Sequence, residues 1–407
     1  MNPFAPSDNR KDLLRHARGL AELAGVALAN RDVLMQFYEL FTGPASHILD
    51  RWFESEILKT TLATDAVIGA NISPKHNGSA YVLLHHVMGE AAGQSGVWAY
   101  VEGGMGAISD AIAASAKSHG AEIVCNASVK RILHSGDRVR GVELEDGTKL
   151  QSDVVLSGAT PYHTFIELLP GLDAALSPLP PDFVHHIRFA DYSCQAFKIN
   201  IACNALPNFK CYPSSPDGLP GPQHRGTTHF EVTMEEIENA YRESSMGMPA
   251  TRPVVEMTIP SSLDATVAPR GQHVVQLFVQ YAPYDVDPKI GHWADPAFKE
   301  DFVHRCFRIV DEFCPGFSSS IIAYDALSPL DLERVFGLHK GSIHHGSLAL
   351  HQLGPARPMF GHSNYRMPLK GLYLVGAGAH PGGGVMGAAG RNGARVVLQD
   401  LGFKLRD

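Results

Sequence analysis

The sequence predicts an α/β fold in which two lobes are interleaved along the chain. Three observations lead to this prediction. Near the end of the chain, a short apolar run precedes a glycine-rich turn and a helical segment. Residues 98–160 alternate between helix and strand patterns, whereas residues 190–340 carry long strands and helices typical of a lobe built on an antiparallel sheet. With 407 residues, the chain is also long for one hydrophobic core.

Residues 1–97 are expected to be mainly helical. The patterns predict one helix over 12–29, another over the apolar stripe of 34–41, and a further one from Ile48 to Ile57 after the break at Gly43-Pro44. The segment before residue 30 has no apolar signal-peptide core, and it carries too many acidic residues for a transit peptide.

Residues 98–160 predict part of a nucleotide-binding α/β lobe. A helix is expected from about Ala107 to His119, with Gly120 in the left-handed position that ends it. Tight turns at residues 135–137 and 146–147 indicate an antiparallel meander inserted between the other elements. The expected strands are Glu122–Cys125, Val129–Leu133, Val139–Leu144 and Asp153–Ser157.

Residues 161–339 are predicted to form the lobe with the antiparallel sheet. Strands are expected at 195–202, 254–259 and 273–281, and helices at 233–241 and 297–313. The tetrapeptide Ser328-Pro-Leu-Asp331 places a serine at an N-cap, a proline at the first helical position and an aspartate at the third.

The glycine-rich turn lies within residues 371–394. Leu372–Val375 is expected to be a buried strand, and a helix is expected to begin near Gly384. On this helix Ala389, Gly393 and Val397 would face the protein, opposite Arg391, Arg395 and Gln399.

Two interpretations of this turn are open. It can be a tight strand-to-helix turn without a ligand, or an anion site at a helix N-terminus where glycines let the ligand approach the backbone. Each glycine inside a helix costs about 1 kcal/mol relative to alanine. The density of glycines therefore favours a ligand packed against the backbone.

The domain prediction has four segments: 1–97 in the second lobe as its helical part, 98–160 in the nucleotide-binding lobe, 161–339 in the second lobe, and 340–407 again in the nucleotide-binding lobe. Neither 98–160 nor 340–407 has enough strands for a closed sheet. We therefore expect Leu372–Val375 to join the sheet that contains Glu122–Cys125.

Composition and local patterns exclude several classes of protein. A net charge of −8 without a basic cluster argues against nucleic acid as a partner. No apolar run approaches the ~18 residues that span a bilayer. The six cysteines form no CxxC pair, so free thiols in a reducing compartment are expected, and no spacing indicates zinc.

No catalytic residue can be assigned from local signatures. GxSxG, P-loop and HExxH patterns are absent from the sequence, and 21 histidines leave a Ser/His/Asp triad open without favouring one. Adjacent histidines diverge by about 100° on a helix, so the pairs at 85–86, 185–186 and 344–345 are not expected to bind a metal.

The sequence nevertheless resembles a known family. Residues 372–392 resemble the C-terminal flavin motif of the carotenoid and retinoid oxidoreductases, the phytoene desaturase-like flavoproteins. Residues 102–110, 119–123 and 140–147 resemble the middle segment of that family. Residues 62–69, 81–89 and 331–337 narrow the resemblance to a mitochondrial member of the family.

The resemblance implies a fold of the glutathione-reductase or amine-oxidase type that binds FAD, with a separate substrate lobe. It also implies an oxidoreductase acting on an apolar substrate, a place in the mitochondrial matrix, and a cytochrome c oxidase subunit as a partner. The backbone of Val129 would meet the adenine end of FAD, and the glycine-rich turn would meet the pyrophosphate, the ribitol and the flavin ring. The implied cofactor-binding residues in that turn are Gly376, Ala377, Gly378, His380, Pro381, Gly382, Gly383, Gly384, Val385, Met386, Gly387 and Ala388.

The chain differs from the family pattern at its start. The family begins with a strand–GxGxxG–helix unit that holds the ADP half of FAD. Residues 1–30 do not match this unit, because their only glycines are Gly19 and Gly25 and no strand is expected before them. We therefore expect this chain alone to bind FAD weakly or not at all. Two functions remain open: an FAD-dependent oxidoreductase, and an interaction or regulatory protein that keeps the fold without turnover.

Overall fold

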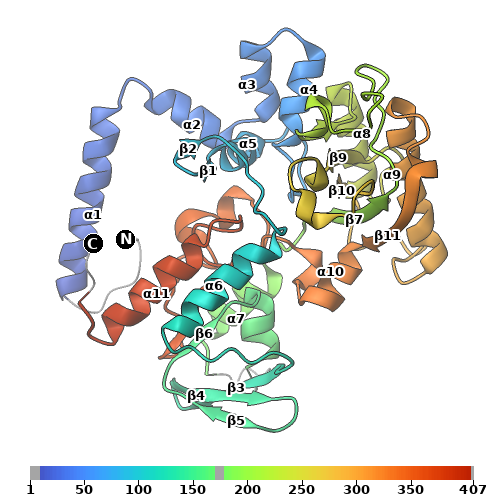
Figure 1. Cartoon of the computed structure of the whole chain (residues 1–407). Coiled ribbons are helices and arrows are strands. Elements are labelled where there is room, and N and C mark those ends of the chain that lie inside the picture. Colours follow the sequence, from blue (N-terminus) through green and yellow to red (C-terminus); the bar gives the residue numbers. More distant parts are fainter. Residues whose placement is uncertain (1–9, 170–177, 405–407) are drawn as a thin grey trace. The chain divides into compact units, whose positions relative to one another are not determined.

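The computed structural model describes residues 10–169 and 178–404 (Figure 1). The chain forms two compact units. The first unit draws on Met1–Glu39, Cys125–Cys194 and Glu333–Asp407, and the second on Leu40–Val124 and Gln195–Leu332. Each unit is therefore built from segments that are far apart in the sequence. The two units are defined by how compactly their residues pack. They do not test the domain boundaries expected from the sequence, which stay predictions.

The first unit holds two small sheets and several helices. Its elements are α1 (Arg10–Ala29), β3 (Val129–Ser135), β4 (Arg138–Leu144), β5 (Lys149–Gln151), β6 (Val155–Ser157), α7 (Pro181–Phe189), β12 (Leu372–Leu374) and α11 (Ala388–Asp400). Helix α2 (Leu34–Thr42) begins in this unit, and α10 (Pro329–Phe336) ends in it.

The antiparallel meander β3–β4–β5 confirms the prediction for residues 129–151. The second sheet pairs β12 with β6 in parallel, with Leu372 opposite Val155 and Leu374 opposite Ser157. Leu372 and Leu374 are buried together with Ile132 of the meander in one apolar core. The C-terminal segment and the middle segment therefore meet in one sheet, as the sequence indicated.

The predicted strand at Glu122–Cys125 was wrong, and β12 does not pair with it. This segment is irregular, and Ile123 and Val124 are 44% and 65% exposed. A β-branched run becomes a strand only where a neighbouring strand accepts and donates its backbone hydrogen bonds. Among the described residues, β6 takes the place beside β12.

The second unit is organised around a five-stranded antiparallel sheet in the order β11-β7-β10-β9-β8. The strands are β7 (Ala196–Cys203), β8 (Thr228–His229), β9 (Val254–Thr258), β10 (His273–Gln280) and β11 (Ile321–Leu327). The predicted strands at 195–202, 254–259 and 273–281 are therefore confirmed. A short hairpin, β1 (Glu90–Ala91) with β2 (Gln94–Ser95), also belongs to this unit.

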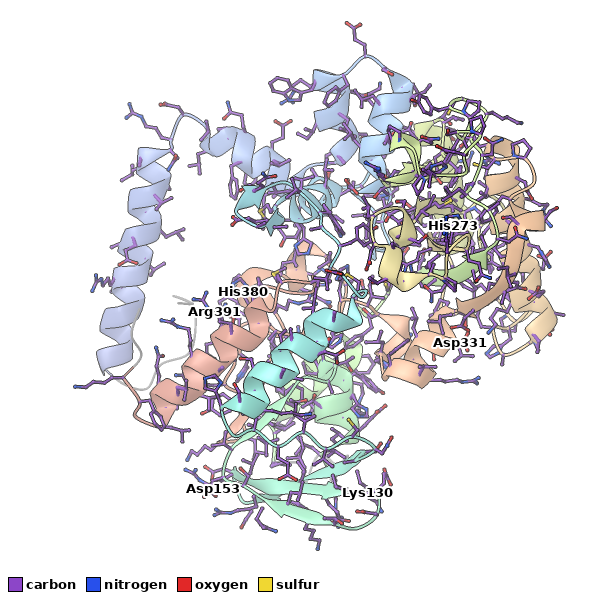
Figure 2. The ribbon with its side chains drawn as sticks, viewed as in Figure 1. Lys130, Asp153, His273, Asp331, His380 and Arg391 are labelled. Carbon is purple, nitrogen blue, oxygen red and sulfur yellow. The ribbon has the colours of Figure 1, made fainter. Side chains whose placement is uncertain are left out.

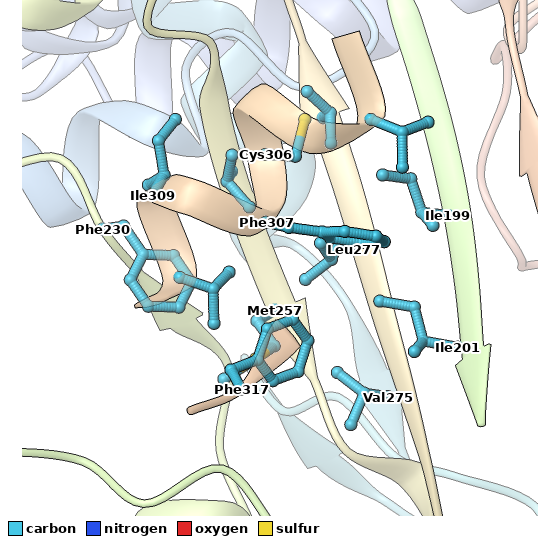
Figure 3. Packing of buried hydrophobic residues seen from close by; sticks show 14 of the residues in the cluster. Ile199, Ile201, Phe230, Met257, Val275, Leu277, Cys306, Phe307, Ile309 and Phe317 are labelled. Carbon is cyan, nitrogen blue, oxygen red and sulfur yellow. The ribbon is translucent and has the colours of Figure 1, made fainter. Parts of the chain in front are cut away.

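One face of the large sheet packs against α9 (Pro296–Phe313) (Figure 3). The period-two pattern of a strand points Ile199 and Ile201 of β7 toward the same side as Leu277 of β10. These side chains are at most 2% exposed. The face meets Phe302 and Cys306 of α9, so the alternation recognised in the sequence positions the core.

Helices cover another part of the second unit. They are α3 (Ala45–Trp52), α4 (Glu56–Thr64), α5 (Ser79–Val87), α6 (Gly106–Ser118) and α8 (Met234–Ser245). The single helix expected from Ile48 to Ile57 was wrong, because Ser55 caps a new helix by accepting a hydrogen bond from the backbone of Leu58 at 3.4 Å. Among the described residues, no helix is long and apolar enough to cross a membrane.

The predicted cap of α10 is confirmed. The Ser328 hydroxyl accepts from the backbone N–H of Asp331 at 3.2 Å, and the Asp331 carboxylate accepts from the backbone N–H of Ser328 at 2.9 Å. This reciprocal arrangement satisfies two backbone donors at the start of the helix.

Candidate functional site

The candidate site is the turn of Val375–Gly387 between β12 and α11, together with the end of β6. Because β6 and β12 are parallel, their carboxyl ends lie at the same edge of the sheet. The backbone N–H of Val375 donates to Ser157 at 2.9 Å, which holds the two ends together. In open parallel sheets ligands bind at this edge, so the topology supports the site that the glycines indicated.

Part of the glycine content serves internal packing rather than a ligand. A Cβ added to Gly376 would lie 2.4 Å from the carbonyl oxygen of Gly158, and one added to Gly378 would lie 2.5 Å from the ring of Pro161. A Cβ on Gly383 would lie 2.4 Å from the His344 ring, and one on Gly393 the same distance from Val375. At these four positions the tight-turn interpretation explains the glycine, because real Cβ atoms do not approach so closely.

Two other glycines, Gly387 and Gly390, face open space. A Cβ built on Gly387 or Gly390 meets no atom within 4 Å. Gly387 is the N-cap of α11 with a left-handed φ of 64°, and no side chain caps the helix. The exposed apolar residues Val385 and Met386 precede it, with 81% and 51% of their surface exposed. This part of the turn offers backbone N–H groups beside apolar surface.

The helix that leaves the turn begins later than the sequence predicted. It starts at Ala388 and not near Gly384, because Gly384 and Gly387 have positive φ values of 141° and 64° that no α-helix accommodates. Its faces are as predicted: Ala389, Gly393 and Val397 are buried. Figure 2 shows His380 in the turn and Arg391 on the first turns of the helix.

Two side chains from outside the turn hold it in place. The Tyr365 hydroxyl donates to the carbonyl oxygen of His380 at 2.8 Å, and the Arg357 guanidinium donates to that of Ala377 at 3.0 Å. The sequence analysis missed both residues. Neither belongs to a local pattern, so only the tertiary structure identifies them.

A small cavity beside the turn is lined by Gly378, His345, Tyr192 and Arg357, among others. Nδ1 of His345 is buried without a hydrogen-bond partner in the described part of the chain. Burial first, and the positive charge of Arg357 second, lower the pKa of His345 to about 4. At neutral pH this ring is therefore uncharged and retains one unused polar atom next to the glycine turn.

The structure brings most of the predicted cofactor-binding residues together. Gly376 to Ala388 are contiguous in the turn, and Ala379 within it is buried in the core of the first unit. Val129 lies at the start of β3 and packs against the same core. Its proposed role toward adenine stays a prediction.

A second glycine turn, at residues 102–106 before α6, is already occupied. The backbone N–H of Gly103 donates to the Asp264 carboxylate at 2.8 Å, and hydrogen bonds from Thr266, Gly103 and Gly104 lower the pKa of Asp264. The backbone N–H of Gly103 is thus already paired with a carboxylate of the same unit.

The sheet face opposite α9 carries charged, partly buried side chains. Burial lowers the pKa of Lys198 to about 8, and burial with the nearby Asp65 raises that of Glu256 to about 7. Lys198 of β7 and Glu256 of β9 are each paired in register with Phe278 of the central strand β10, and so lie on either side of it. Next to Glu256, the pKa of His229 is lowered to about 4 by burial.

No metal centre accompanies these groups. Within residues 10–169 and 178–404, no cluster of three or more His, Cys, Asp or Glu side chains could hold a metal ion. Of the histidine pairs, His86 uses Nδ1 on the backbone carbonyl of Val82 at 2.8 Å, and His344 packs beneath Gly383.

Comparison with known proteins defines the class. Residues 7–193 match the family model of flavin-containing amine oxidoreductases. An oxidoreductase from Methanosarcina mazei superposes with a TM-score of 0.54 at 16% identity, over 90% of this chain and 71% of that chain. A redesigned putrescine oxidase superposes with a TM-score of 0.53 at 13% identity, over 98% and 77%. The fold is therefore an amine-oxidase-like, FAD-binding α/β fold.

Sequence relatives are more specific. Pyridine nucleotide-disulfide oxidoreductase domain-containing protein 2 of Rattus norvegicus is 48% identical over 395 residues, which cover 96% of this chain and 67% of the relative. The protein of the same name from Mus musculus is 47% identical over the same lengths. A lycopene-forming phytoene desaturase of Pantoea ananas is 25% identical, over 96% of this chain and 70% of the relative.

The chain belongs to the flavin-containing amine oxidoreductase family. Within it, the chain is a close homologue of pyridine nucleotide-disulfide oxidoreductase domain-containing protein 2. Proteins of this family contain a flavin. The geometry of the turn fits part of a flavin nucleotide. The uncapped N-terminus of α11, the open glycines and the unused Nδ1 of His345 are the features that fit.

Proposed function

We propose that this protein is an FAD-dependent oxidoreductase of the desaturase or dehydrogenase type, and that the turn of Val375–Gly387 holds part of the flavin nucleotide. The open, uncapped helix N-terminus at Gly387 carries the proposal. Its N–H groups and the helix dipole favour an anion, which in FAD is the diphosphate. The exposed Val385 and Met386 would lie against the apolar ring.

FAD, when bound, supplies the acceptor for a hydride from the substrate. In this proposal the chain positions the nucleotide through the backbone of the turn and excludes water with its apolar residues. An apolar substrate is proposed from the family resemblance. Lys198 and Glu256, whose pKa values are shifted by burial, lie in the other unit, and mutation of each tests whether it affects the reaction.

The proposed affinity of this chain alone for FAD is low. A contact between an anion and an exposed helix end stabilises binding by roughly 0.3–1 kcal/mol. One such end, with the open glycines beside it, gives weak binding that gel filtration would remove. We therefore expect colourless purified protein and a small rise of its melting temperature with FAD. A stoichiometric flavin spectrum after gel filtration would contradict this expectation.

The site itself can be tested by filling it. A Cβ added at Gly390 meets no protein atom within 4 Å outside the backbone of its own helix, so Gly390→Val should block the ligand without disturbing the fold. Gly25→Val in α1 is the matched control, because this glycine also has no atom within 4 Å of its built Cβ. In an equilibrium FAD titration, Gly390→Val should bind at least tenfold more weakly and Gly25→Val as the unchanged chain. Equal affinity of both variants would exclude the N-terminus of α11 as part of the flavin site.

The location and partner are also proposals. We propose the mitochondrial matrix and an association with a cytochrome c oxidase subunit, on the strength of the family resemblance alone. Fractionation of mitochondria with a tagged protein, followed by affinity capture from the matrix fraction, tests both. Absence of the protein from the matrix fraction would rule out this location.

A further inference from the structure

The strongest unassigned feature near the turn is the buried side chain of Arg357, which is 2% exposed. A guanidinium has five N–H groups, and here five backbone carbonyl oxygens accept from them. Nε donates to Ala377 at 3.0 Å, Nη1 to Ser347 and Gln352 at 3.1 and 3.3 Å, and Nη2 to His344 and to Gly346, the latter at 3.3 Å.

These bonds join segments that the sequence separates. Four of the acceptors lie in residues 344–352, whereas Ala377 belongs to the glycine turn. The segment 344–352 is itself fixed, since the backbone N–H of Ser347 and the amide of Gln352 each donate to the carbonyl oxygen of Asp191 at 2.9 Å. Arg357 therefore connects the turn to a segment that is itself hydrogen-bonded to Asp191.

The glycine turn also rests directly on this segment. A Cβ on Gly382 would lie 3.5 Å from Nε of Arg357, and one on Gly383 would lie 2.4 Å from the ring of His344. A Cβ at Gly382 would make only an ordinary van der Waals contact with the arginine, whereas Gly383 is needed for the backbone to lie on the segment that Arg357 binds. Without the guanidinium, the five carbonyl groups would lose their donors and the turn its support.

The positive charge of Arg357 reaches the turn as well. It contributes, after desolvation, to the lowered pKa of His380 within the turn and of His345 beneath it. A buried cation beside the turn adds to the favourable field for an anion.

We propose that Arg357 is a positioning residue that holds the glycine turn in the conformation that receives the anionic diphosphate of a flavin nucleotide. This inference rests on the proposed function of the turn. In this inference Arg357 fixes the conformation of the site and adds a positive charge to it. It takes no part in the chemistry, because backbone carbonyl groups of the protein already accept from its five N–H groups.

The test compares Arg357→Gln and Arg357→Lys with Arg140→Gln. Arg140 is an exposed arginine of the same unit that pairs with Asp153 at 2.7 Å. Backbone hydrogen exchange is measured at Ala379 and Met386, whose N–H groups are bonded inside the turn at 3.0 Å. Affinity for FAD is measured by equilibrium titration, and circular dichroism checks folding.

Arg357→Gln should exchange at least tenfold faster at both amides and bind FAD at least tenfold more weakly. Arg357→Lys keeps the positive charge but has fewer N–H donors. Its exchange rates and its affinity for FAD should therefore lie between those of Arg357→Gln and those of the unchanged protein. Arg140→Gln should leave both readouts unchanged. If Arg357→Gln does not fold, the lysine variant alone decides by the same two measurements.

Unchanged exchange in the Arg357 variants would overturn the inference, as would faster exchange with FAD affinity within twofold of the unchanged protein. If the unchanged protein binds no FAD at all, the proposed function fails. The exchange measurement then still decides whether Arg357 positions the turn, so the two failures are distinguishable.

Discussion

The same substitution, glycine to alanine, should have opposite effects on stability at Gly376 and Gly390. At Gly376 the new methyl group would lie 2.4 Å from the carbonyl oxygen of Gly158 and 3.0 Å from its carbon. Backbone atoms cannot move aside as a flexible side chain can. The ends of β6 and β12 must therefore separate, which endangers the hydrogen bond from Val375 to Ser157 at 2.9 Å.

The magnitudes can be estimated from these contacts. Overpacking of this kind costs about 1–3 kcal/mol, and the strained hydrogen bond contributes about 1 kcal/mol. We expect Gly376→Ala to lower the free energy of unfolding by about 2–4 kcal/mol. At Gly390 the methyl group meets no atom within 4 Å and the φ angle lies outside the left-handed region, so alanine should raise stability by about 0.5–1 kcal/mol in the helix.

Urea unfolding of both variants measures the difference. Trp52, Trp98 and Trp293 all belong to the second unit, so tryptophan fluorescence reports that unit. Circular dichroism reports the unfolding of both units. If the unfolding transition shifts in circular dichroism but not in tryptophan fluorescence, the loss of stability lies in the first unit. Free energies of unfolding that agree within about 0.5 kcal/mol for the two variants would refute the reasoning. A methyl group added against the backbone of Gly158 would then cost no more than one added in open space.

Two further predictions concern the second unit. Burial, and then Asp65, raise the pKa of Glu256 to about 7. Because this folded-state value exceeds the ordinary 4.5, the stability from the protonated carboxyl is complete below pH 4.5 and is lost as the pH rises through 7. Glu256→Gln should therefore unfold at the same urea concentration as the unchanged protein near pH 4, but be up to about 3 kcal/mol more stable at pH 8.5. Parallel pH profiles of the two proteins would contradict this. Phe302→Ala should cost about 3–5 kcal/mol in urea unfolding, because its side chain is 1% exposed. Phe336→Ala, in the first unit and at 58% exposure, should change stability by less than about 0.5 kcal/mol, and similar losses for both phenylalanines would argue against the core as described.

The sequence predicted the regular elements well where one face of an element is buried. The alternation around Ile199 predicted β7, and the four-residue spacing of Ala389, Gly393 and Val397 predicted the buried face of α11. In these cases the side chain itself carries the signal, because burial depends on its position along the element. The cap at Ser328 is equally local, since its partner Asp331 lies within one turn.

The sequence could not decide which strands pair or which glycines face a ligand. The strand predicted at Glu122–Cys125 contains suitable residues but finds no neighbouring strand among the described residues. Gly376 and Gly390 look alike in the sequence, yet one lies against Gly158 and the other faces open space.

Taken by itself, the sequence indicated the family through its resemblance to known motifs, and its own patterns indicated the two-lobe α/β class and the place of the glycine turn. Those patterns depend on the order of residues along the chain and on periods of a few residues. Only the tertiary structure decided that β6 pairs with β12, that four glycines are packing residues, and that Arg357 supports the turn. Such contacts join residues about 20 to more than 200 positions apart, and the physical terms that select them, excluded volume and the pairing of buried backbone groups, have no local pattern in the sequence.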